Sequence, residues 1–182
     1  MKKKGVSPVI ATVLLLVLTI VAISILAVFI IPFVKNSLGS SKGCFDVLGD
    51  IKFDAEGRYN CHAQSTSPLG TLRTGFSVRI DSDEIVGFSL TLFQQGSANS
   101  FRIENGTTDP DVVSVLRMLT ADFNKPLIVP IKGGVRTYVA KGAFERAEVN
   151  PILSNGKTCD AQETIVLNPC TDSEAISALL AY

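Results

Sequence analysis

The chain changes its hydrophobic pattern at Lys35. Val6–Val34 contains no charged residue and is mostly aliphatic, so it predicts one continuous apolar helix. Such a helix would be about 43 Å long, which exceeds the ~30 Å hydrocarbon core of a bilayer. Beyond Lys35, short apolar runs alternate with polar residues and are separated by turn residues, a pattern typical of β-strands. The sequence therefore predicts an α+β protein.

The predicted architecture is a long N-terminal hydrophobic α-helix followed by a mainly antiparallel, β-sandwich-like domain with one short inserted helix. Ser7-Pro8 is a typical helix start, with serine as the cap and proline in the first turn. The predicted strands are Asp50–Glu56 paired with Cys61–Gln64, then Gly75–Asp81, Ile85–Gln94, an edge strand at Pro126–Ile131, Val135–Ala140, Ala143–Val149, and Glu163–Leu167.

Two segments show a helical period in the second part of the chain. Pro110–Thr120 follows the capping residue Asp109, and its apolar residues fall on one face, so we expect it to cover the sheet. Ser173–Tyr182, with Asp172 or Ser173 as its cap, is predicted either to dock as a short helix or to fray. Asn155-Gly156 is a strong signal for a hairpin turn.

Asp81-Ser82-Asp83-Glu84, between two predicted strands, is expected to be the loop of a hairpin. Its three acidic residues also allow a calcium loop, but the glycine and the distant glutamate of an EF-hand are absent. A solvated loop is the preferred interpretation, and no metal or other cofactor is expected.

The charge pattern divides the chain further. Met1–Gly5 is a positively charged leader, 6–34 a transmembrane helix, 35–43 a flexible polar linker, and 44–182 the β-rich domain. Without Lys2, Lys3 and Lys4, the balance is 14 basic against 17 acidic residues. This mildly acidic body provides no basic surplus for nucleic acid.

The four cysteines, Cys44, Cys61, Cys159 and Cys170, all lie beyond the hydrophobic segment. An even number in an exported domain indicates two disulfides. No Cys-x-x-Cys pair is present, which argues against a zinc ribbon. Three pairings are open; the local pairs Cys44–Cys61 and Cys159–Cys170 are weakly preferred because each joins neighbouring segments.

The residues Lys4-Gly5-Val6-Ser7-Pro8-Val9-Ile10-Ala11, followed by the aliphatic run, resemble the N-terminus of archaeal type IV pilins, with their class III signal peptide. The resemblance covers about Lys3–Lys35. It implies that a prepilin peptidase cuts between Gly5 and Val6 and that the helix is retained. Bacterial pilins usually carry a glutamate where this chain has Ile10, and the archaeal pattern lacks that acid too.

The resemblance implies a structural subunit of a surface filament. Its partners would be further copies of itself, the prepilin peptidase, the membrane, and an assembly platform with its ATPase. Because positive residues stay in the cytoplasm, we expect a single-pass precursor whose N-terminus is cytoplasmic and whose β-rich domain is extracellular. The alternative is a membrane-anchored binding protein or minor pilin that does not polymerise.

An enzyme is the least favoured function. His62, the only histidine, follows Cys61, and adjacent residues of a strand point to opposite faces, so the two do not form a nucleophilic pair. No phosphate-binding or hydrolase motif is present. Asn105-Gly106-Thr107 is a sequon, and Asn105 is a candidate for N-glycosylation.

Overall fold

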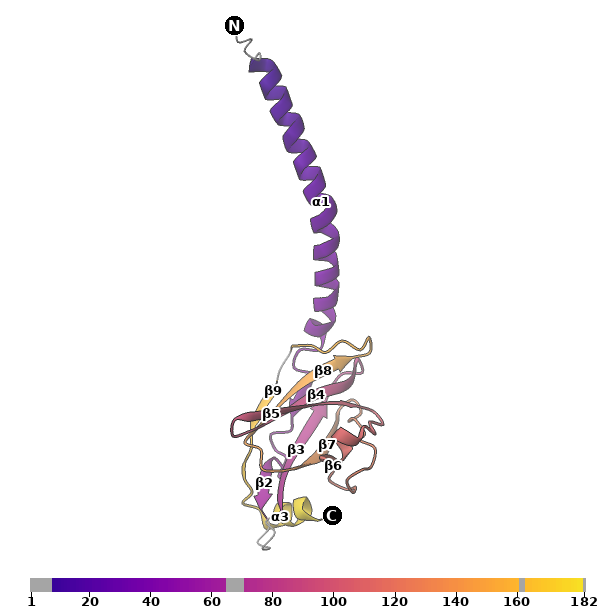
Figure 1. Cartoon of the computed structure of the whole chain (residues 1–182). Coiled ribbons are helices and arrows are strands. Elements are labelled where there is room, and N and C mark those ends of the chain that lie inside the picture. The colour runs from indigo at the N-terminus through magenta and orange to yellow at the C-terminus, as the bar shows by residue number, and fades with distance from the viewer. Residues whose placement is uncertain (1–7, 65–70, 161–162, 182) are drawn as a thin grey trace. The chain divides into compact units, whose positions relative to one another are not determined.

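The computed structural model describes residues 8–64, 71–160 and 163–181, and it has an α+β fold as the sequence predicts (Figure 1). The chain divides into two compact units, Met1–Gly43 and Cys44–Tyr182. We call the second unit the β domain. Helix α1, Pro8–Asp46, makes up the described part of the first unit, and its last residues belong to the β domain.

Helix α1 continues through residues 35–43, which the sequence predicts to be a flexible linker. The prediction of irregular structure is wrong here. Extending a helix that is already nucleated adds one hydrogen bond for each residue fixed, whereas nucleation is costly. The helix continues although Gly39 and Gly43 each cost roughly 1 kcal/mol in a helix interior.

The β domain contains two sheets with almost wholly antiparallel pairing (Figure 1). In the first sheet the order is β10-β2-β3-β7-β6, and β1 also pairs with β3; in the second it is β5-β4-β8-β9. The first sheet consists of β1 (Ile51–Phe53), β2 (Cys61–Gln64), β3 (Leu72–Ile80), β6 (Leu116–Met118), β7 (Gly134–Lys141) and β10 (Asn168–Pro169). The second consists of β4 (Ile85–Gln94), β5 (Ser97–Glu104), β8 (Arg146–Leu153) and β9 (Glu163–Val166).

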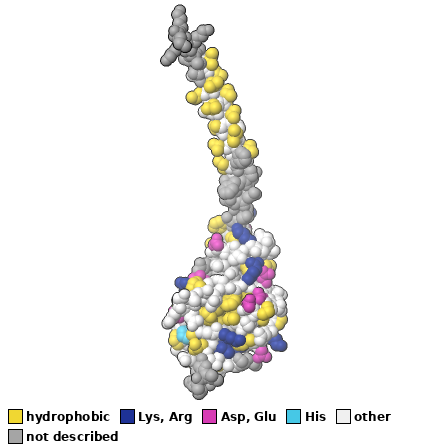
Figure 2. Space-filling view, in the orientation of Figure 1, with side chains coloured by type: hydrophobic (Ala, Val, Ile, Leu, Met, Phe, Trp, Pro, Cys, Tyr) yellow, Lys and Arg dark blue, Asp and Glu magenta, His cyan; other side chains and the backbone are white. Residues whose placement is uncertain are grey.

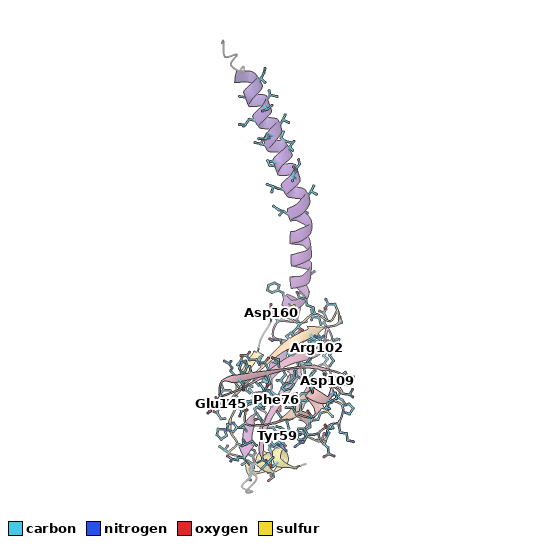
Figure 3. All side chains as sticks on the ribbon, in the orientation of Figure 1. Tyr59, Phe76, Arg102, Asp109, Glu145 and Asp160 are labelled. Atoms are coloured by element: carbon cyan, nitrogen blue, oxygen red, sulfur yellow. A yellow bond between two sulfur atoms is a disulfide. The ribbon has the colours of Figure 1, made fainter. Side chains whose placement is uncertain are left out.

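The main core lies between the two sheets. Phe76 on β3 stacks on Tyr138 of β7, and Phe88 on β4 meets the same tyrosine edge-on with ring centroids 5.6 Å apart. All three rings are fully buried, and Figure 3 shows Phe76 inside the domain. Aromatic contacts from both sheets therefore hold the two layers together.

The opposite face of the first sheet is covered at one end by helix α3, Ser173–Leu180. Asp172 caps this helix by accepting a hydrogen bond from the Glu174 amide at 2.8 Å. A second apolar cluster lies beneath it, formed by Cys61, Ala63, Val139, Ala175 and Leu179. Of the two predictions for the C-terminal segment, docking as a short helix is therefore the correct one.

Gly75 on β3 allows α3 to approach the sheet. A Cβ atom at this position would lie 2.4 Å from the carbonyl oxygen of Tyr59 and 2.5 Å from Leu179 Cδ2. Both distances are too short for non-bonded atoms, so only glycine permits this close contact.

The hairpin predicted around Asp81–Glu84 is wrong, because β3 and β4 belong to different sheets. The connection passes from one sheet to the other. The alternating pattern predicts the two strands but not the sheet to which each belongs. By contrast, β4 forms a hairpin with β5 through a tight turn at Gly96, and the sequence pattern does not predict β5. Strand β5 is polar and exposed along most of its length, so it lacks the alternation of apolar residues from which a strand is predicted.

The helix predicted at Pro110–Thr120 is largely wrong. Asp109 does cap a helix, accepting a hydrogen bond from the Asp111 amide at 3.0 Å, but α2 ends at Val113. After Ser114 and Val115, Leu116–Met118 form β6, which pairs with the edge of β7. The hydrogen bonds available at that edge override the helical period.

Pro126–Ile131 forms no strand; only Leu127 makes an isolated bridge, to Thr107. Cys61–Gln64 pairs with β3 and β10 instead of with the strand at Ile51–Phe53. The turn at Asn155-Gly156 is present, with Gly156 at φ +79° directly after β8.

Candidate functional site

The most unusual surface of the molecule is that of α1. Its large aliphatic side chains are exposed all around the helix, for example Leu14 at 69% and Val28 at 68%. Figure 2 shows hydrophobic atoms covering the described part of this helix. The exposed large hydrophobic residues of its apolar part are Ile10, Val13–Leu18, Ile20, Val21, Ile23, Ile25, Leu26, Val28, Ile30 and Ile31, and Phe45 is exposed near the end of the helix. A helix that is apolar on every side needs an apolar environment or apolar partners.

Two hydroxyl groups in the apolar part of α1 form hydrogen bonds within the helix. The Thr19 hydroxyl donates to the carbonyl oxygen of Leu16 and that of Ser24 to the carbonyl oxygen of Ile20, each at 2.8 Å. The first turn contains no acidic residue. Contacts of this surface therefore depend on packing and not on ion pairs. Among the residues that the structure describes, none of the helices combines the length and the apolar character that crossing a membrane requires.

The residues of the resemblance lie at the start of α1. Pro8, Val9, Ile10 and Ala11 form its first turn, and Ile10 is exposed. The predicted processing residues Lys4, Gly5 and Val6, together with Ser7, lie outside the described residues.

The four cysteines form two disulfides, Cys44–Cys159 and Cys61–Cys170, with Cα–Cα distances of 5.5 and 5.0 Å. The weakly preferred local pairing is wrong. Cys61 lies on β2 and Cys170 follows β10, and these strands are neighbours in the first sheet. The cysteines pair with those that lie next to them in the folded domain, and these come from strands that are far apart in the sequence.

Because Cys61 is bonded to Cys170, it has no free thiol beside His62. The His62 ring lies with Nδ1 3.1 Å from the carbonyl oxygen of Leu167. This strand therefore holds no Cys-His nucleophile.

Two of the three acidic residues at Asp81–Glu84 form surface ion pairs. Asp81 lies 2.7 Å from Lys52 Nζ and 2.8 Å from Arg79 Nε, and Asp83 lies 2.8 Å from Lys132 Nζ. Hydrogen bonds from Lys52 and then Arg79 hold the pKa of the Asp81 carboxyl below its ordinary value. The described residues contain no cluster of three or more groups suited to a metal ion.

Asn105 lies in the turn that follows β5 and is exposed. The turn is held by Thr107, whose hydroxyl accepts a hydrogen bond from the Glu104 amide and donates one to the Glu104 carbonyl oxygen. Asn105 lines an open groove together with Arg102 and Asp109, both labelled in Figure 3. An enzyme acting on this asparagine would find its side chain at the surface.

Arg117 is a structural residue whose role the sequence pattern does not predict. Its side chain is fully buried and donates to six backbone carbonyl groups. Three of these, at Ala178, Leu179 and Ala181, belong to the end of α3. A basic residue at the negative end of a helix dipole stabilises that end. Nothing in the local sequence indicates this, because Arg117 and α3 are about sixty residues apart.

Comparison with known proteins identifies the N-terminal segment. Residues 4–37 match the family model described as archaeal type IV pilin, N-terminal. The match confirms the resemblance seen at Lys4–Ala11 and includes most of the uninterrupted apolar surface of α1. The chain is thus pilin-like at its N-terminus. No curated protein and no solved structure matches the chain.

Proposed function

We propose that this chain is a structural subunit of an archaeal type IV pilus or a related surface filament. The match of residues 4–37 to the pilin N-terminal model carries the proposal. The apolar surface all around α1 supports it, because such a surface is suited to packing against copies of the same helix. The β domain would be displayed on the outside of the filament.

The proposal assigns a stage to each part of the chain. Met1–Gly5 is the leader that a prepilin peptidase removes, 6–34 is the polymerisation helix, 35–43 connects it, and 44–182 is the extracellular domain. Before assembly, the uncharged segment holds the precursor in the membrane while the leader stays in the cytoplasm. Removing the leader takes away charges that oppose extraction from lipid. An assembly platform and its ATPase would then move the subunit into the filament.

The absence of an acid near the new N-terminus has a consequence for subunit register. Ile10 occupies the fifth position of the proposed mature chain, where bacterial pilins usually carry glutamate. An acid–amine pair between neighbours therefore does not set the register of this helix. Shape complementarity between aliphatic side chains has to do so.

Intact mass and N-terminal sequencing of the mature protein test the proposal, together with imaging of sheared surface filaments. We expect the wild type to begin at Val6 and to be present in filaments. Gly5→Leu should retain Met1 and form no filaments, and Gly39→Leu, the same substitution outside the cleavage site, should behave as the wild type. A wild-type protein that retains Met1 would refute the pilin function. A start at Val6 without filaments would favour the non-polymerising alternative.

We further propose that Asn105 carries an N-linked glycan, supported by its exposure in the turn after β5. The intact mass of the surface protein should fall by the mass of one glycan in Asn105→Gln. Asn155→Gln, which alters an asparagine outside any sequon, should leave the glycan mass in place. Equal glycan masses in all three proteins would exclude modification at Asn105.

A further inference from the structure

Three basic side chains converge on one aromatic ring of the β domain. Lys141 Nζ lies 4.3 Å from the centroid of the Phe123 ring, and the guanidinium carbons of Arg73 and Arg117 lie 5.2 and 5.5 Å from it. They come from β7, β3 and β6, so three strands of the first sheet supply them. We call Arg73, Lys141 and Phe123 the cationic cluster.

The cluster lies on the sheet face that carries α3. Arg73 is directly opposite Lys141 in the β3–β7 pairing, two residues along each strand from Gly75 and Val139, which pack beneath α3. Because side chains alternate along a strand, residues two apart share a face. Like charges directly opposite each other across two strands repel and destabilise a sheet.

Arg117 is held by the carbonyl groups at the end of α3, to which its guanidinium donates. Arg73 donates through Nη1 to the carbonyl oxygen of the adjacent Leu72, and its buried Nε has no hydrogen-bond partner among the described residues. Burial also lowers the pKa of Arg73. The interaction with the Phe123 ring compensates part of this cost, but no carboxylate contributes.

Within the described part of the chain, the ion pairs all lie away from the cluster. They join Lys52 and Arg79 to Asp81, Arg58 to Glu174, Arg102 to Glu104, Lys132 to Asp83, and Arg146 to Glu148. Lys141 is exposed and Arg73 half-buried, so both remain within reach of a group from outside the domain. Two cations beside one ring, with no described acid in contact, provide the donor set for a carboxylate.

The charge of the domain indicates where that carboxylate comes from. Residues 44–182 contain 12 Lys and Arg against 17 Asp and Glu, a net charge of −5. Exposed acids such as Glu84, Asp109 and Glu163 take part in none of the described ion pairs. Two such domains repel each other overall. Neighbours in a filament are held close together, however, at a high effective concentration, where one complementary contact can offset the repulsion.

We propose that Arg73 and Lys141 form a carboxylate-binding site that receives an Asp or Glu side chain from a second copy of this chain. This inference rests on the proposed function, because the filament supplies the second copy. Arg73 would contribute directional hydrogen bonds and Lys141 an exposed charge, while Phe123 holds both cations in place. The result is a salt-sensitive contact between β domains, in addition to packing between the N-terminal helices.

Carbodiimide cross-linking of isolated filaments tests this contact, because the reagent joins a lysine amine to a carboxylate only when the two touch. Treated filaments are separated on a denaturing gel, and the monomer and dimer bands are digested separately for mass spectrometry. Lys132 and Asp83, 2.8 Å apart within one chain, provide the internal standard in the monomer band. We expect Lys141 joined to an Asp or Glu in the dimer band and not in the monomer band.

Arg73→Gln retains Lys141 but removes the guanidinium, and it should lower the Lys141 cross-link in the dimer band several-fold. Arg58→Gln, the same substitution at an exposed ion pair, should leave the cross-link unchanged. The site assignment is overturned if the Lys132–Asp83 link forms in filaments while Lys141 stays unlinked, links only to its own chain, or links to an acidic polysaccharide. Failure to obtain filaments instead refutes the proposed function.

Discussion

Tyr138 shows how a single polar atom is accommodated in the core between the sheets. The ring is fully buried between Phe76 and Phe88, and its hydroxyl donates to the carbonyl oxygen of Ile128 at 2.7 Å. Burial raises the pKa of Tyr138 far above its ordinary value, so the hydroxyl remains a donor at any physiological pH. The hydrogen bond also fixes the irregular segment at Ile128, where the sequence pattern predicts a strand.

Removing that hydroxyl tests its contribution. Tyr138→Phe should lower the free energy of unfolding by about 1–2 kcal/mol, because the Ile128 carbonyl loses its partner. Urea unfolding of the full chain in detergent, followed by circular dichroism, measures the change. Tyr59→Phe is the matched control, since its hydroxyl makes no hydrogen bond among the described residues. Equal stability of Tyr138→Phe and wild type would contradict the prediction.

Asp81 is expected to make the β domain sensitive to acid. Hydrogen bonds from Lys52 and Arg79 lower the pKa of Asp81 in the folded state, whereas the unfolded chain has the ordinary value near 4. Its contribution to stability is therefore present above about pH 4 and is lost as the pH falls through the depressed folded value.

Urea unfolding at pH 6 and pH 3 should show a smaller loss of stability for Asp81→Asn than for the wild type. Asp83→Asn removes one carboxylate from a more exposed single ion pair and serves as the matched control. If Asp81→Asn loses as much unfolding free energy between pH 6 and pH 3 as the wild type does, Asp81 has no role in the acid sensitivity.

At the scale of elements, α3 depends on contacts with strands that precede it by many residues. Its apolar face packs above Gly75, its start is capped by Asp172, and its end is held by Arg117. The cap and the apolar face can be seen in the helix's own sequence, but its partners Gly75 and Arg117 cannot, which explains why docking and fraying are equally compatible with that sequence.

Arg117→Lys should loosen α3 without removing the charge, because an ammonium group cannot reach the set of carbonyls that the guanidinium reaches. Amide hydrogen exchange in Ser173–Leu180 should accelerate at least tenfold. Arg58→Lys alters an exposed ion pair to the same helix and should have little effect, as is usual for surface pairs. Unchanged exchange in Arg117→Lys would show that apolar packing alone holds α3.

On the scale of the whole molecule, the two disulfides join the beginning of the β domain to its end. They span 115 and 109 residues of sequence. Cys44 is part of α1, so the first disulfide also fastens the last turn of that helix to the loop between β8 and β9. Closing loops of this size restricts the unfolded chain, which is worth about 2–5 kcal/mol for a native disulfide.

Digestion with trypsin and a glutamate-specific protease, without reductant, should separate Cys159 from Cys170 by cleavage at Glu163. Residues 43–52 should then be joined to 158–163, and 59–73 to 164–174. A link between Cys44 and Cys61 would contradict the structure. Cys61→Ser/Cys170→Ser should reduce the free energy of unfolding by about 2–4 kcal/mol, whereas Ser173→Ala/Ser177→Ala, at the α3 surface, should change it little.

The sequence by itself determined the properties that depend on local composition. The uncharged run Val6–Val34 fixes the apolar helix, the residues around Lys4–Ala11 carry the likeness to pilins, and the alternation in Ile85–Gln94 yields β4 with the bounds predicted. The caps at Asp109 and Asp172 and the turn at Asn155-Gly156 are also local. Each of these signals depends on residues only a few positions apart, so the local sequence is enough to predict it.

The tertiary structure alone decided which distant segments meet. It placed β3 and β4 in different sheets, turned Leu116–Met118 from a predicted helix into an edge strand, and paired Cys44 with Cys159. It also brought Arg73, Lys141 and Phe123 together from three parts of the chain. These outcomes depend on the hydrogen bonds and packing that a partner strand offers, and the identity of that partner is absent from any local stretch of sequence.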